Sequence, residues 1–64
     1  MIINALRKKY EYEIASAKAN IGAYQKNPTG IGEHPEIIEA IETQIEKIAN
    51  AEEKIATIEK YFSR

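Results

Sequence analysis

Cysteine and tryptophan are absent from this 64-residue chain, which also has only two prolines, three glycines and one histidine. Without cysteine, neither a disulfide framework nor a thiolate zinc site can form, so stability must come from packing or association. The longest apolar run is residues 1–3, far short of a signal-peptide core or of the ~20 apolar residues of a membrane span. We therefore expect a soluble, cytoplasmic protein without a membrane partner.

Helical periodicity dominates what is present. Apolar residues recur three, four or seven positions apart, the spacings of one face of an α-helix. In the first half of the chain they are Ile3, Tyr10, Ile14, Ala17, Ile21 and Tyr24. In the second half they are Ile37, Ile41, Ile45, Ile48, Ala51, Ile55, Ile58 and Phe62. The pattern predicts an all-α fold with helices at about 3–26 and 35–62. Because Gln44, Glu52 and Glu59 interrupt a strict coiled-coil seam, we expect only gentle supercoiling.

Both prolines and the histidine lie in the segment 27–34 or directly after it. Asn27 precedes Pro28 and is disfavoured in the α region, so the first helix should end near Lys26. His34 likewise precedes Pro35 and is the predicted N-cap, with Pro35 as the first helical residue. The short connection predicts an antiparallel two-helix hairpin. The predicted turn and cap residues are Asn27, Pro28, Gly30, Ile31, Gly32, His34 and Pro35.

A hairpin of this size buries few large side chains, so one copy alone is marginal. The apolar stripe of the second helix is also too broad for one neighbouring helix to cover. We expect self-association, most simply a two-fold dimer that forms a four-helix bundle, or docking onto another helical protein. The predicted oligomer or partner interface is Tyr10, Ile14, Ile21, Ile38, Ile41, Ile45, Ile48, Ile55 and Phe62.

Residues that could carry catalysis or hold a metal are few. His34 has Glu33 and Glu36 nearby, but a zinc site needs three or four ligands, and a single histidine beside a proline fits a cap. Ser16 and Ser63 lie far along the predicted rod from His34, which excludes a nucleophile and base pair. We therefore predict no enzyme activity, no cofactor or metal site and no small-molecule substrate.

Charge is divided unevenly although the net charge is only −1. Residues 1–26 hold five Lys or Arg against two Glu, and residues 27–64 hold four against eight Glu. Arg7, Lys8 and Lys9, with Tyr12, could contact phosphates and stack on bases. A nucleic-acid-binding regulatory hairpin dimer is therefore the alternative function. A basic helical turn followed by two glutamates is more often a solvated surface, so we do not expect nucleic acid as the main partner.

The segment Asn27 to Ile45, "NPTGIGEHPEIIEAIETQI", resembles a motif of short uncharacterised helical-hairpin proteins of tailed bacteriophages. That motif is Asn-Pro-x-Gly-[Ile/Val]-Gly-[Glu/Asp]-His-Pro followed by an amphipathic helix, and the similarity continues through "EKIANAEEKIATIEKYF". The resemblance implies a phage origin and a host-cell cytoplasmic or virion setting, but no activity or site. The first hypothesis is thus a small non-enzymatic interaction protein with a phage accessory or host-modulating role.

Overall fold

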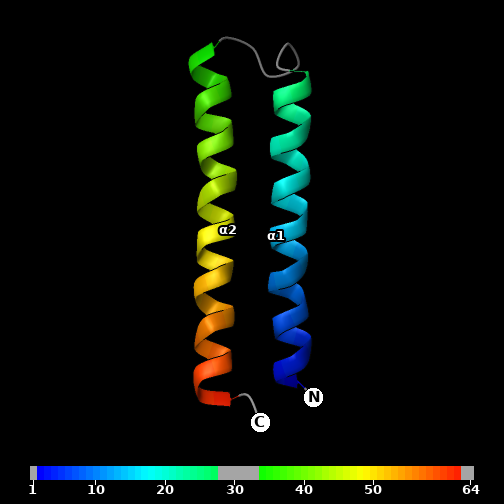
Figure 1. Cartoon of the computed structure of the whole chain (residues 1–64), viewed down its shortest axis with the longest axis vertical. Helices are drawn as coiled ribbons and strands as arrows, with labels where there is room; N and C mark the ends of the chain where they lie inside the picture. The colour runs from blue at the N-terminus through cyan, green and yellow to red at the C-terminus, as the bar shows by residue number, and fades with distance from the viewer. Residues whose placement is uncertain (1, 28–33, 63–64) are drawn as a thin grey trace.

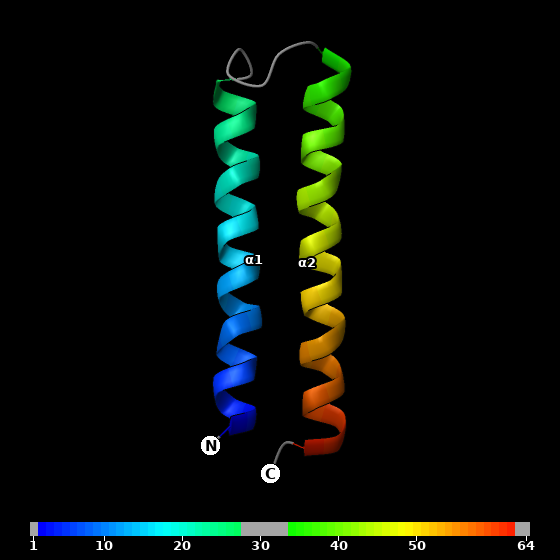
Figure 2. The ribbon, with the colours of Figure 1, turned by 180° about the vertical axis from the view of Figure 1, so that it is seen from behind.

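The computed structural model describes residues 2–27 and 34–62, which form two long helices (Figure 1). Helix α1 spans Ile2–Lys26 and helix α2 spans His34–Phe62. Figures 1 and 2 show the helices side by side and running in opposite directions. No strand occurs within the described residues. The predicted all-α helical hairpin is confirmed.

The ends of the helices follow local sequence signals. The Asn27 amide donates a hydrogen bond to the Ala23 carbonyl at 2.9 Å, which closes α1. Basic residues occupy the last turn of each helix and Glu36 the first turn of α2, so these charges complement the helix dipoles. Helix α2 begins at His34, one residue before the predicted first helical residue, Pro35.

Other predicted turn and cap features lie outside what the structure describes. They are the placement of Pro28, Gly30, Ile31 and Gly32 and the side chains of His34 and Pro35.

The two helices meet along a seam with strictly alternating spacings of four and three residues. On α1 the seam residues are Ile3, Arg7, Tyr10, Ile14, Ala17, Ile21 and Tyr24, and on α2 they are Ile37, Ile41, Gln44, Ile48, Ala51, Ile55 and Ile58. All of them are buried or half-buried. The mean spacing of 3.5 is that of a coiled coil. The seam therefore has a regular coiled-coil repeat on both helices.

The expectation that Gln44 interrupts the seam is wrong. Gln44 is only 7% exposed, whereas its neighbour Ile45 is 52% exposed. Asn20 Nδ2 on α1 donates a hydrogen bond to Gln44 Oε1 at 3.2 Å. Because a buried amide costs little once it is hydrogen-bonded, the seam continues through Gln44 and leaves Ile45 outside.

Small residues occupy the best-buried positions. Ala17 and Ala51 are each 1% exposed, and Ile58 is the third buried apolar residue of the described chain. Alanine at the contact lets helix axes approach closely but contributes little buried area. Consequently, no large side chain in residues 2–27 and 36–62 is completely buried.

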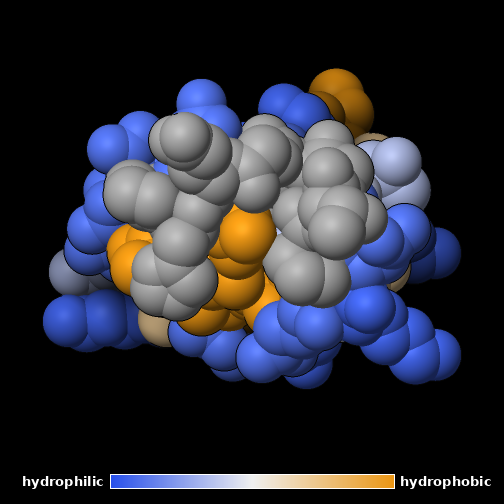
Figure 3. All heavy atoms as spheres, turned by 90° about the horizontal axis from the view of Figure 1, so that it is seen from above, coloured by the Kyte–Doolittle hydropathy of each residue, from blue (hydrophilic) through white to orange (hydrophobic). Residues whose placement is uncertain are grey.

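Three contacts between the helices fix one antiparallel register. Arg7 pairs with Glu59 at 3.0 Å, Lys54 Nζ lies 5.9 Å from the centre of the Tyr10 ring, and Asn20 bonds to Gln44. The resulting rod measures 46 × 15 × 13 Å. Figure 3, which looks along it, shows hydrophobic residues between the helices and hydrophilic residues around much of the rim.

Candidate interaction surface

The hairpin has two different long faces, one on each side of the seam. We call one the polar groove; its nine lining residues are Tyr12, Glu13, Ser16, Ala17, Asn20, Gln44, Lys47, Asn50 and Lys54. We call the other the apolar flank; it consists of exposed Ile38 and Ile45 with the half-buried Ile14, Ile21, Ile41 and Ile48 beside them. At 100° per residue, Lys47 and Lys54 lie on one side of the α2 seam, and Ile38 and Ile45 lie on the other.

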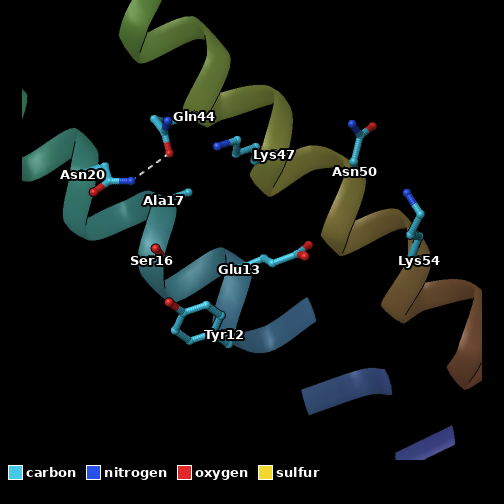
Figure 4. A pocket seen from close by; sticks show the side chains of 9 residues that line it. All are labelled: Tyr12, Glu13, Ser16, Ala17, Asn20, Gln44, Lys47, Asn50 and Lys54. Carbon is cyan, nitrogen blue, oxygen red and sulfur yellow. Dashed lines mark hydrogen bonds between the residues drawn. The ribbon is translucent and has the colours of Figure 1, made fainter. Parts of the chain in front are cut away.

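The polar groove is a shallow hydrogen-bonding surface of about 400 Å³. Figure 4 shows Glu13 extending from α1 toward α2, the Asn20–Gln44 hydrogen bond, and Lys47 and Lys54 projecting from α2. Both charge signs are present among these side chains. Two lysines against one glutamate give the lining a formal charge of +1.

The apolar flank exposes two large aliphatic side chains on the first half of α2. Ile38 is 56% and Ile45 is 52% exposed, and their seven-residue spacing puts them on one side of the helix. Single exposed apolar residues are normal on protein surfaces, but these two adjoin the half-buried Ile41 and Ile48. Exposed apolar surface of this kind is a candidate for protein contact.

The nine predicted interface residues therefore occupy two environments. Six are half-buried in the seam within one hairpin, namely Tyr10, Ile14, Ile21, Ile41, Ile48 and Ile55. Ile38, Ile45 and Phe62 are exposed. Phe62 lies at the open end of the hairpin, where its ring packs edge-on to Tyr61 with centroids 6.4 Å apart. Only these three of the nine project most of their side chains away from the hairpin.

The basic stretch of α1 does not form one patch. Arg7 is in the seam and pairs with Glu59, and Lys9 Nζ lies 3.9 Å from a Glu13 carboxylate oxygen and 5.9 Å from the Tyr10 ring centre. Lys8 is exposed. Tyr12 is exposed too and lines the polar groove. Two of the three cations thus already interact with carboxylates of the same chain.

Within the described ranges, no group of three or more His, Cys, Asp or Glu side chains is placed to hold a metal ion. Neither described helix has a stretch long and apolar enough to cross a membrane. The predicted capping role of His34 involves a side chain that lies outside the described part of the chain.

Two features of the seam were not predicted from the sequence, the Asn20–Gln44 pair and the inward position of Arg7, because a hydropathy pattern gives polar residues no inward preference. Ala17 and Ala51 were predicted on the apolar stripes and are buried. The strict alternation of four and three residues through these positions was the available signal. No protein-family profile, curated protein or solved structure matches the chain.

Proposed function

We propose that this chain is a small non-enzymatic interaction protein that self-associates through the apolar flank. The supporting observation is the pair of exposed isoleucines, Ile38 and Ile45, beside a seam that leaves Ile41 and Ile48 half-buried. A second hairpin would cover all four side chains and convert two helices into a four-helix bundle.

The surface area of the chain supports the same proposal. The accessible surface is 5082 Å² for a mass of 7.3 kDa. A compact monomer of this mass has roughly 4,200 Å², so the hairpin exposes about 900 Å² more. A standard protein interface covers about 800 Å² on each partner. The excess therefore matches what one docked partner would remove.

The resemblance of the segment that begins at Asn27 to phage hairpin proteins supports an accessory or host-modulating role in the cytoplasm of an infected cell. In that setting, another helical protein would dock onto the same flank in place of the second copy. A regulator that binds nucleic acid is less well supported, because Arg7 and Lys9 already interact with Glu59 and Glu13.

The proposal is tested by molar mass as a function of concentration, measured by sedimentation equilibrium. We expect the unaltered chain to form dimers at micromolar concentration and Ile45→Asp to be monomeric, because the carboxylate would be desolvated in the interface. Ile2→Asp makes the same change at an exposed isoleucine away from the flank and should leave the dimer intact. A chain that stays monomeric, or equal effects of both variants, would contradict the proposal.

The alternative function is tested by measuring binding to nucleic acid. Salt-dependent binding of duplex DNA or RNA that disappears in Lys8→Glu/Lys9→Glu would support it. No binding at low salt would remove it.

A further inference from the structure

We infer that the second copy lies with its helix connection at the same end of the rod, so that α1 of each copy packs on α2 of the other. This inference rests on the proposed self-association and adds the arrangement of the two copies. Two hairpins that face each other through the apolar flank have two simple two-fold arrangements. The axis runs either along the rod, which aligns the connections, or across it, which places them at opposite ends.

The exposed side of α2 is divided along its length. Positions 38, 45, 52 and 59 lie seven residues apart and therefore on one side of the helix; they are Ile, Ile, Glu and Glu. An axis across the rod would set Ile38 and Ile45 of one copy opposite the glutamates of the other. An axis along the rod keeps the two isoleucines level with the isoleucine end of the partner's α2 and the two glutamates level with its glutamate end. Desolvation of carboxylates against isoleucine is costly, so the axis along the rod is favoured.

The charges of the helices favour the same axis. Helix α1 carries five Lys or Arg against two Glu, and α2 carries three Lys against seven Glu, with His34 counted as neutral. An axis along the rod places each basic α1 beside an acidic α2 of the other copy. An axis across the rod places α1 on α1 and α2 on α2. Juxtaposed like charges disfavour an interface, and opposite charges specify it.

Gly22 is a third observation that favours the axis along the rod. It lies inside α1, where glycine is a poor helix former, and a Cβ added there would meet nothing within 4 Å in the hairpin. Residue 22 follows Ile21 of the apolar flank, and the Asn20–Gln44 contact puts it at a height between Ile38 and Ile45. With the connections aligned, the isoleucines of the other copy's α2 approach α1 at this height. A glycine permits such close approach of a side chain to the helix backbone.

Spin-label distances discriminate between the two axes, since the chain has no native cysteine to remove. Lys26→Cys places a label at the end of α1, and Ser16→Cys places one near its middle on the groove side. Both labels point away from the partner, so aligned connections, which keep each pair of labels at one height, predict about equal distances at the two sites, roughly 25–35 Å across a four-helix bundle. Opposed connections keep the labels at position 16 at one height but shift those at position 26 apart by about 30 Å along the rod. The distance at position 26 should then exceed that at position 16 by about 10 Å.

A substitution at Gly22 gives an independent readout. Gly22→Ala should raise the dimer dissociation constant about tenfold or more by overfilling a close contact, while the dilute monomer melts no lower than the unaltered chain. Asn50→Ala also raises helix propensity, but it lies on the polar groove and should leave the dissociation constant unchanged.

The possible results separate the two claims. A dimer in which the distance at position 26 clearly exceeds that at position 16, or a Gly22→Ala dimer as tight as the original, overturns the arrangement and leaves self-association standing. A monomer at all concentrations overturns both. About equal distances at both positions together with a weakened Gly22→Ala dimer support the arrangement.

Discussion

The hydrogen bond between Asn20 and Gln44 allows a sharp test of why a polar residue occupies the seam. Gln44 is buried and accepts a hydrogen bond from Asn20, which is itself exposed. Removal of the Asn20 side chain leaves the buried Gln44 oxygen without its hydrogen-bond donor, whereas removal of the Gln44 amide leaves an Asn20 amide that water can reach. The two single substitutions should therefore differ in their effects on the free energy of unfolding.

The magnitudes follow from burial. Asn20→Ala leaves a buried carbonyl oxygen unpaired, which costs about 1–3 kcal/mol, while the gain in helix propensity returns roughly 0.5 kcal/mol. Gln44→Leu removes the buried amide and adds apolar contact in the seam, so we expect a change between zero and about 1 kcal/mol of stabilisation. In a chain of this size, 1 kcal/mol shifts the melting temperature by about 4–8 °C.

The assay is urea unfolding followed by far-UV circular dichroism on the unaltered chain, both single variants and the double variant. All four are measured at one protein concentration, because association raises apparent stability by mass action. We expect Asn20→Ala to be harmless when it is combined with Gln44→Leu, which corresponds to a coupling energy of about 1–2 kcal/mol. A coupling energy near zero, or equal losses from the two single substitutions, would refute the assignment of Gln44 as a buried residue satisfied by Asn20.

Three other substitutions probe the seam and its edges. Ile58→Ala should cost about 2–4 kcal/mol in urea unfolding, because Ile58 is the best-buried large side chain of the described residues; a loss below ~1 kcal/mol would contradict that burial. Glu59→Gln should cost no more than about 1 kcal/mol, and the loss should vanish at high salt, since the ion pair with Arg7 is partly exposed. A salt-independent loss would point to a packing role. Ala17→Leu should destabilise by about 1–3 kcal/mol through overpacking, whereas the same change at exposed Ala19 should be neutral; similar effects at both positions would exclude close helix approach at Ala17.

Helices and hairpin were predictable because their signals are local. Apolar residues three or four apart define each helix, and Asn27 with the following proline ends the first one. The structure gives Ile2–Lys26 and His34–Phe62 for segments predicted at about 3–26 and 35–62. Nothing long-range is needed for such an assignment, since periodicity and proline sterics act within one turn.

The seam itself was harder to predict because its partners lie far apart in sequence. Hydropathy favours Ile45 over Gln44 as an inward residue, and it gives no reason to place Arg7 between helices. Gln44 is satisfied by Asn20, 24 residues away, and Arg7 by Glu59, 52 residues away. Neither pairing can be read from one helix alone. The sequence therefore predicted an apolar stripe too broad for one neighbour, with Ile38 and Ile45 in the interface, but it could not place the seam at Gln44 instead of Ile45.

The choice between Gln44 and Ile45 also explains why an apolar flank exists. A seam rotated toward Ile45 would continue at the same spacing through positions 38, 41, 45, 48, 52, 55 and 59, which include Glu52 and Glu59. Burial of two carboxylates costs several kcal/mol each unless both are fully paired, whereas burial of one hydrogen-bonded amide costs little. Helix α2 therefore turns its glutamates outward along its whole length, and Ile38 and Ile45 turn outward with them. The same rotation that keeps charge out of the hairpin creates the surface on which a second chain can pack.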